Sequence, residues 1–137
     1  MLVDGRGVVL GIAVAGANRN DHRLVQATFD GSPTGCPAPP TGVEQGVWLD
    51  KGYDYDAVYG VVCQNGYIPH IVPRDTEREW LERIPGYRAR RWPVERTHSW
   101  MHRFRRILVR WEKKAANYTA LVHLVCAFIA FKQAGVT

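Results

Sequence analysis

The sequence has few of the residues that stabilise small extracellular or metal-dependent domains. Only three of its 137 residues are cysteines, and Cys36, Cys63 and Cys126 form no CxxC pair. A disulfide framework or a structural zinc site is therefore not expected, and a reducing cytoplasm is the expected compartment. The first residues also lack the charged and then apolar layout of a signal peptide.

Long apolar runs and several well-known catalytic motifs are missing too. The longest apolar run, 121–131, has 11 residues and contains His123. It is shorter than the roughly 20 residues that span a bilayer, so it predicts a buried helix and no membrane partner. The chain contains no GxxxxGK[ST] and no Gly-x-Ser-x-Gly. His98 and His102 have the spacing of a zinc-binding pair, but the HExxH glutamate is absent, which favours histidines that face solvent or phosphate.

Positive charge is concentrated in one segment. Residues 88–114 hold ten of the eighteen lysines and arginines but only two acids, Glu95 and Glu112, in a chain whose net charge is +5. Tryptophans and a phenylalanine lie between these basic residues. Such a composition is typical of a surface that binds nucleic acid, although a solvated cationic face is the simpler alternative.

The hydrophobic pattern predicts an α/β domain. Residues 1–30 read as a hairpin followed by a short helix, and the proline- and glycine-rich 31–45 as a loop. Residues 46–72 read as strand, helix and strand, which implies parallel pairing. Residues 74–91 read as an exposed connection. Residues 88–134 are expected to hold a basic helix from Pro93 to about Trp111, and an apolar helix from about 117 to 133 with Leu121, Leu124, Phe128 and Phe131 on one stripe.

One carboxylate stands where an α/β sheet places its functional groups, and a second lies on the basic helix. Asp50 ends the strand 46–50, and Glu95 lies in the first turn of the basic helix. Together they could hold Mg²⁺ or Mn²⁺ for phosphoryl transfer, because hard cations prefer carboxylate oxygens. Taken alone, each has a simpler reading, Asp50 as a helix cap and Glu95 as a partner of the helix dipole.

The sequence segments around both carboxylates resemble bacterial insertion-sequence transposases of the DDE class. The resemblance rests on Leu49-Asp50-Lys51-Gly52-Tyr53-Asp54, on residues 91–100 (RWPVERTHSW) and on the arginine-rich 103–106. The opening residues 2–7 (LVDGRG) and residues 16–21 (GANRND) are similar to that family as well. The resemblance implies a ribonuclease H-like mixed sheet flanked by helices, a divalent metal ion, and strand cleavage and transfer at the double-stranded ends of a mobile DNA element.

Carried over by position, the resemblance makes Asp50 the second catalytic aspartate and Glu95 the catalytic glutamate, both metal ligands. Arg91 matches the basic residue one turn before the glutamate, which would contact a DNA phosphate. The family's later basic position falls on His102, with Arg103 beside it. The DNA-contacting residues expected from this resemblance are Lys51, Arg91, Arg96, Arg103 and Arg106.

The family's first catalytic aspartate has no counterpart here. It belongs to a central first strand upstream of the Leu-Val-Asp-Gly-Arg-Gly hairpin, and Asp4 is better explained as a turn former. The chain is therefore expected to be an N-terminally incomplete catalytic domain that lacks this strand. Its partners would include an upstream-frame polypeptide or frameshift fusion, and the complete protein would act as a multimer near the bacterial nucleoid. Two strand edges would lose their pairing, so the isolated chain is expected to be inactive and poorly stable.

Two other functions remain open from the sequence. One is a catalytically dead remnant that binds DNA through the basic segment 88–114. The other is a cationic module that binds a partner other than nucleic acid. Loss of DNA binding with salt but no dependence on magnesium would favour the remnant, and no binding to duplex DNA at low salt would favour the module.

Overall fold

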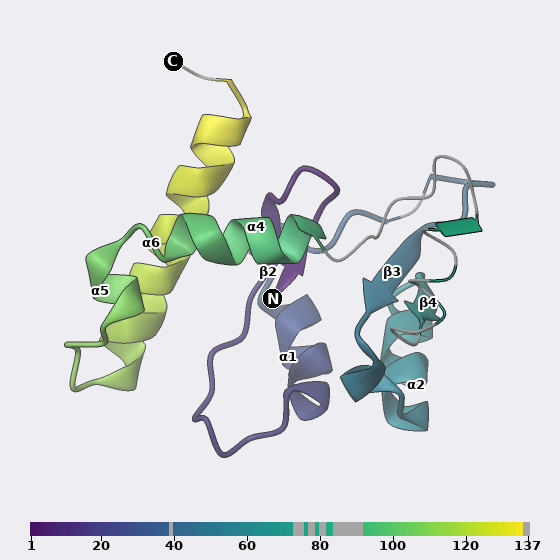
Figure 1. Ribbon diagram of the computed structural model, residues 1–137, viewed down its shortest axis with the longest axis horizontal. Helices are drawn as coiled ribbons and strands as arrows, with labels where there is room; N and C mark the ends of the chain where they lie inside the picture. Colours follow the sequence, from purple (N-terminus) through teal and green to yellow (C-terminus); the bar gives the residue numbers. More distant parts are fainter. Residues whose placement is uncertain (39, 73–75, 77–78, 80–81, 84–91, 136–137) are drawn as a thin grey trace.

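The computed structural model describes the chain except residues 39, 73–75, 77–78, 80–81, 84–91 and 136–137 (Figure 1). Its first sheet pairs β1 (Leu2–Val3) with β2 (Val9–Gly11) in antiparallel fashion. Asp4 forms the connecting turn, because its Oδ1 accepts hydrogen bonds from the backbone N–H groups of Arg6 at 2.9 Å and Val8 at 2.8 Å. The hairpin predicted within residues 1–30 is confirmed.

The predicted strand–helix–strand unit is also confirmed. β3 (Gly46–Leu49) pairs in parallel with β4 (Ile68–Ile71), and α2 (Asp56–Gln64) connects them after the short 3-10 turn η2 (Lys51–Tyr53). Gly66, at φ +81°, ends the connection after α2 as a residue in the left-handed region. The α/β class is therefore established, and among the described residues the four strands form two separate two-stranded sheets.

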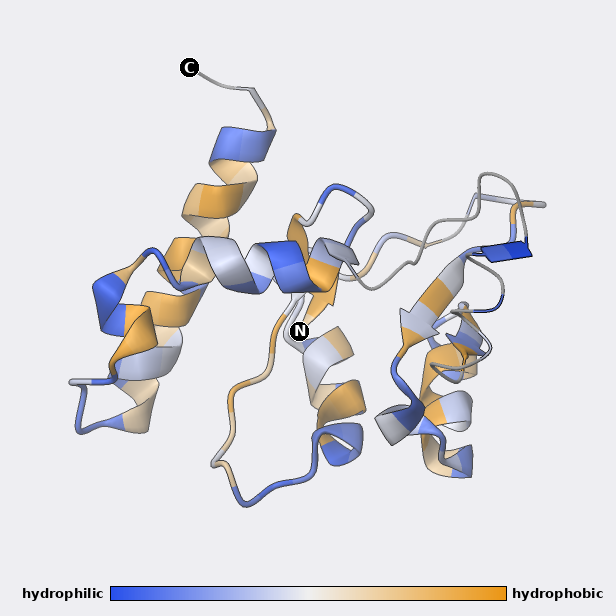
Figure 2. Cartoon of the chain, viewed as in Figure 1, coloured by the Kyte–Doolittle hydropathy of each residue, from blue (hydrophilic) through white to orange (hydrophobic). Residues whose placement is uncertain are grey.

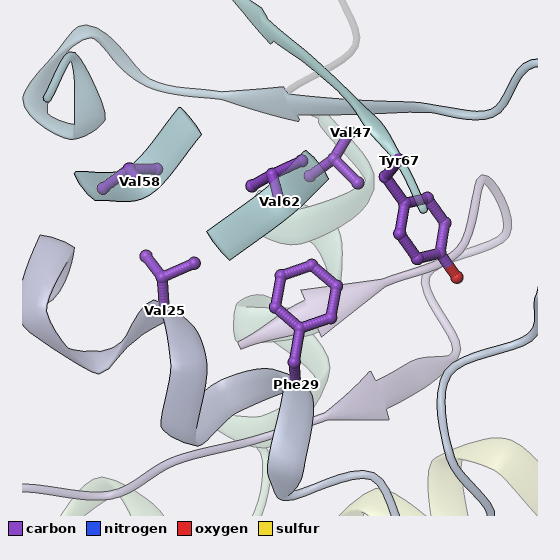
Figure 3. Close-up of a cluster of buried hydrophobic side chains, with 6 residues drawn as sticks. All are labelled: Val25, Phe29, Val47, Val58, Val62 and Tyr67. Atoms are coloured by element: carbon purple, nitrogen blue, oxygen red, sulfur yellow. The ribbon is translucent and has the colours of Figure 1, made fainter. Parts of the chain in front are cut away.

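A first apolar core joins the strand–helix–strand unit to the helix after the hairpin. The turn η1 (Asp21–Leu24) leads directly into α1 (Val25–Asp30), where the sequence predicted a short helix. Figure 3 shows side chains from α1, β3, α2 and the residue before β4 converging in this core. Its buried members are Val25, Phe29, Val47, Val58, Val62 and Tyr67.

The predicted basic helix is broken into two. α4 (Trp92–Met101) ends before Phe104, whose backbone is extended at φ −90° and ψ 104°, and α5 (Arg105–Leu108) follows. The expectation of one helix to Trp111 is therefore wrong. At this break Phe104 packs edge-on against Phe128 of the last helix, with the two ring centroids 5.6 Å apart. Tertiary packing has overridden the local helical pattern.

The last helix, α6 (Ala115–Gln133), packs through a different stripe from the one predicted. Its buried residues are Val122, Val125, Cys126 and Ile129, which meet Met101 and Ile107 in a second core. Leu124, Phe128 and Phe131, expected in the core, are 67%, 45% and 55% exposed. Because α6 is apolar on most of its surface, as Figure 2 shows, periodicity alone could not select the buried face.

Among the described residues, α6 is the one helix that is long and apolar enough to cross a membrane by length and composition. Since the core helix of a soluble protein meets the same criterion, this is weak evidence. One face of α6 packs on α4, α5 and β2, as in a helix that covers a protein core.

Candidate functional site

Asp50 lies directly after β3, at the carboxyl end of the strand. Its Oδ1 accepts a hydrogen bond of 2.7 Å from the backbone N–H of Lys51, and this contact begins η2. The residue is exposed and its backbone is extended, at φ −73° and ψ 157°. Asp50 therefore acts as a cap for η2, and its carboxylate stays exposed at the carboxyl end of β3.

Glu95 is an exposed residue of the first turn of α4. The helix is fixed beneath it by Thr97, which is fully buried and whose hydroxyl donates to the carbonyls of Gly7 at 2.7 Å and Pro93 at 2.9 Å. This contact ties α4 to the turn between β1 and β2, 90 residues earlier in the chain. The rotation of α4, and with it the direction of Glu95, is thus set by the hairpin.

The residues directly before the two carboxylates border a common hollow. A cavity of about 550 Å³ lies between the β1–β2 sheet and β3, and a second of about 300 Å³ continues toward α1. Leu49 and Val94 line both cavities, and each directly precedes one of the two candidate carboxylates. The end of β3 and the start of α4 therefore both border this hollow, and neither Asp50 nor Glu95 is itself among the residues that line it.

A further acidic residue lies at the hollow, and the sequence had singled it out only as the last residue of the family-like segment 16–21. Asp21 lines the smaller cavity together with Tyr53 and His98. Burial raises the pKa of the Tyr53 hydroxyl, and the negative charges of Asp21 and Asp50 raise it further. Two carboxylates therefore act on one phenol here. The resemblance of residues 16–21 to the family was the available signal at Asp21, and it assigned no role to this carboxylate.

Arg96 is placed differently from a mobile DNA-binding side chain. Its guanidinium stacks on the rings of Trp92 and Trp100, 3.8 and 4.9 Å from their centroids. Its Nε and Nη2 are buried and have no hydrogen-bond partner among the described residues. The aromatic faces compensate part of the desolvation of the cation. Arg96 therefore packs against two tryptophans of α4, with its Nε and Nη2 withdrawn from solvent.

The other predicted DNA contacts are spread around the described surface. Lys51, Arg103 and Arg106 are exposed. Arg106 is paired with Glu112, with Nη2 and Oε1 3.2 Å apart. Arg91 lies outside the described residues, so its predicted contact stays a prediction.

The two candidate carboxylates are of the right chemical type to bind a divalent metal ion, but they are fewer than the three ligands that a metal site in this part of the chain would need. Asp50 and Glu95 offer the hard oxygen ligands that Mg²⁺ prefers. No group of three or more His, Cys, Asp or Glu side chains that could hold a metal ion occurs within the described ranges. His98 and His102, with ring centroids 6.3 Å apart, are not joined by a third such residue there. Within the described part of the chain, these residues therefore do not complete a metal site.

His98 makes the stability of this region dependent on pH. Burial lowers its pKa below 6.5, and the nearby positive charges of the N-terminal ammonium and His102 lower it further. The unfolded chain therefore binds a proton more readily than the folded one. We expect the free energy of unfolding to fall as the pH drops from about 7.5 through 6.5 toward the depressed pKa. Urea unfolding between pH 5 and 8 measures this dependence.

In the variant His98→Gln, the decline over this range should become shallower, because the group that titrates differently in the two states is gone. His123→Gln is the matched control, since that histidine lies on the exposed side of α6. An unchanged slope in His98→Gln would show that other groups cause the acid sensitivity.

Comparison with known proteins identifies the class to which this arrangement belongs. A family model described as "Transposase DDE domain" matches residues 1–129. Over 133 residues the chain is 32% identical to a Burkholderia cepacia protein named as a transposase for insertion sequence element IS402, covering 96% of this chain and 61% of that protein. No solved structure matches. The chain belongs to the DDE transposase family, and it spans about three fifths of the curated relative that it matches.

Proposed function

We propose that this chain supplies two of the catalytic carboxylates of a transposase that cleaves and transfers DNA strands at the ends of an insertion element. The observation that carries the proposal is the convergence of the Asp50 strand end and the Glu95 helix start on one hollow, through Leu49 and Val94. DNA transposition is the function of the family, and the assignment of the chemistry to these two residues is ours.

The proposal includes the fold and the cofactor that the family implies. The two small sheets would be parts of one ribonuclease H-like sheet, and Mg²⁺ or Mn²⁺ would be bound by Asp50, Glu95 and at least one ligand from outside the described residues. The metal ion would supply the Lewis acidity that in-line attack on a phosphodiester needs. The expected location is the bacterial cytoplasm, close to the nucleoid, and the assembled enzyme would be a multimer on paired DNA ends.

The chain's own residues have separable tasks in this proposal. Asp50 and Glu95 present carboxylates from a strand end and a helix that Thr97 holds in place. Lys51 and Arg103 offer exposed cations to the phosphate backbone. Arg91 is proposed to contact a phosphate one turn before Glu95.

The test is cleavage of duplex DNA that carries the element end. The protein to assay is the chain joined in frame to the polypeptide encoded directly upstream, compared with residues 1–137 alone. We expect magnesium-dependent cleavage by the joined protein and none by the isolated chain. Cleavage by the isolated chain in magnesium would refute its expected inactivity, and no cleavage by either protein would leave DNA binding as the function to explain.

A non-enzymatic DNA-binding remnant is the second candidate, because the arginines around α5 are exposed whether or not a metal site forms. We expect residues 1–137 to bind duplex DNA with an affinity that falls steeply with salt. Arg103→Gln should reduce the slope of log K against log salt by about one. Arg106→Gln should have a smaller effect, because Glu112 already neutralises part of that charge.

Filter binding across 50 to 200 mM salt, with and without magnesium, measures these slopes. Equal effects of the two substitutions would show that the Arg106–Glu112 pair opens on DNA. No binding at low salt would remove the DNA-binding candidate and favour a cationic module with another partner.

A further inference from the structure

Helix α6 has two apolar faces, and the fold buries one of them. That face packs on α4, α5 and β2 in the second core. On the other face Leu124, Phe128 and Phe131 stay 67%, 45% and 55% exposed. Figure 1 shows the C-terminal half of α6 extending beyond the other elements. A helix that is hydrophobic all round is normally buried on all sides, so this second face calls for a cover.

The exposed side chains on this face follow a regular repeat. Asn117, Ala120, Leu124, Ala127 and Phe131 are all exposed, and the intervals between them alternate between three and four residues. This is the seven-residue repeat with which one helix packs along another. We call these five residues the outer stripe. None of them is charged, so the outer stripe has the composition and the spacing of a helix–helix contact.

The sizes of these side chains indicate how two copies of the outer stripe would pack. Two small residues, Ala120 and Ala127, alternate with two large ones, Leu124 and Phe131. In a parallel pair each layer joins a residue to its own copy, so the alanine layers would leave voids. In an antiparallel pair Leu124 meets Ala127 of the second copy, and Ala120 meets Phe131. Each of these layers then holds one large and one small side chain, which packs evenly.

The antiparallel register also suits the length and the ends of α6. The same register places Asn117 opposite Ala134 and overlaps the two helices from residue 118 to 133, which is nearly all of Ala115–Gln133. Lys114, at the N-cap of α6, comes within reach of the last turn of the second copy's α6. The unpaired carbonyls of that turn carry partial negative charge, which a lysine complements. Residues 113–135 include no acid, so no carboxylate loses its water in this contact.

The exposed area indicates a weak dimer. An aromatic side chain has roughly 150 to 250 Å² of surface, so the exposed parts of Phe128 and Phe131 together amount to about 200 Å². With Leu124 and the alanines, each copy would bury on the order of 400 to 500 Å². The pair would then bury about 800 to 1,000 Å², which is less than the roughly 1,200 Å² at which stable interfaces begin. Such a contact is expected to depend on protein concentration.

We propose that two copies of this chain associate through the outer stripe of α6, as an antiparallel helix pair with Leu124 against Ala127. A second copy fits better than DNA, because the outer stripe offers no cation to a phosphate. It fits better than an unrelated apolar surface, because the alternating sizes are complementary to themselves under a two-fold rotation. This interface rests on the multimer named in the proposed function, and it requires neither a metal ion nor DNA cleavage.

The experiment is sedimentation equilibrium of residues 1–137 in buffer without DNA or magnesium. We expect a monomer at about 1 µM and mostly dimer at about 300 µM, as for a small interface. Leu124→Lys should weaken the dimer by at least about tenfold, because each copy would enclose a charge among apolar groups. Val43→Lys is the matched control, since Val43 is 54% exposed and lies in the loop before β3. This control should dimerise like the unaltered chain.

Two further variants test the register. Ala127→Leu should weaken an antiparallel pair, because two large side chains would share a layer, whereas it would strengthen a parallel pair by filling a void. Leu124→Lys and Ala127→Glu should each be monomeric alone. Their mixture should form a dimer, because the introduced lysine faces the introduced glutamate only in the antiparallel register. The exposed position of Leu124 predicts an unchanged circular dichroism spectrum, and Ala127→Leu answers the same question without a charge if Leu124→Lys does not fold.

The chain joined in frame to its upstream polypeptide should also dimerise and depend on Leu124 in the same way. A joined protein that stays monomeric would overturn the proposal, because the added polypeptide would then cover α6. So would residues 1–137 that stay monomeric at about 300 µM, an equal loss in Val43→Lys, or a mixture of the two charged variants that does not dimerise. A monomer that still cleaves element-end DNA would refute this interface alone, and a dimer that never cleaves would refute the catalytic proposal alone.

Discussion

Replacing Asp50 by Asn or Glu95 by Gln is expected to reduce magnesium-dependent cleavage of element-end DNA by on the order of a thousandfold. Each change removes one negative charge and one strong oxygen ligand while keeping the shape of the side chain. Metal ions contribute several kcal/mol to such reactions, and about 1.4 kcal/mol corresponds to a factor of ten in rate. The measurement is single-turnover cleavage by the chain joined to its upstream polypeptide.

The controls separate chemistry from folding and DNA affinity. Asp54→Asn alters an exposed carboxylate four residues after Asp50, which accepts a hydrogen bond from Tyr59 at 3.4 Å. We expect its cleavage rate to stay within about twofold of the unaltered protein, since surface substitutions away from a site have small effects. DNA binding without metal should persist in Asp50→Asn and Glu95→Gln. Equal loss of cleavage in all three variants would assign the effect to net charge.

The local part of this structure was predictable because its signals lie within short stretches of chain. The strand, helix and strand read from residues 46–72 were sufficient to predict β3, α2, β4 and their parallel pairing. The turn at Asp4 follows from the chemistry of Asp-Gly. In each case the deciding interaction joins residues close in sequence or is imposed by the handedness of the chain.

The features that sequence analysis missed depend on contacts between distant residues. The break before Phe104 accompanies its contact with Phe128, and Thr97 is buried because it meets Gly7. Helix α6 is apolar almost all round, so its periodicity does not say which stripe is buried. Asp21 lies at the hollow beside Tyr53 because η1 packs against η2, about 30 residues later in the chain. None of these pairings leaves a mark in the local pattern.

In the candidate site, too, some features could be predicted from the sequence and others depend on contacts between distant residues. The family resemblance selects Asp50 and Glu95, and the structure brings the residues before them to one hollow. The structure also shows that Arg96, which the sequence predicted to contact DNA, is partly enclosed by tryptophan rings. A count of basic residues cannot distinguish a cation that supports the helix from one that is available to DNA, because the difference lies in which face of α4 it occupies.

Two glycine-to-alanine changes are expected to alter stability in opposite directions. A Cβ at Gly11 of β2 would collide with the backbone carbonyl of Thr28 in α1. Because a backbone atom cannot move aside as a side chain can, Gly11→Ala should lower the free energy of unfolding by about 3 kcal/mol. Gly60 lies inside α2 with nothing within 4 Å of a new Cβ. Gly60→Ala should raise the free energy of unfolding by about 0.5 to 1 kcal/mol, since alanine is the better helix former.

The close approach of α1 and β2 is reciprocal, and this makes the prediction stricter. A Cβ at Gly31, just after α1, would collide with the carbonyl of Ile12, just after β2. Once either change has pushed the two elements apart, the other should cost less, so Gly11→Ala and Gly31→Ala should be less than additive in urea unfolding. Additive losses would mean that each glycine is needed separately. A Gly11→Ala protein as stable as the original would show that α1 does not lie on β2, and the hollow that shares its walls with α1 would then need a different outline.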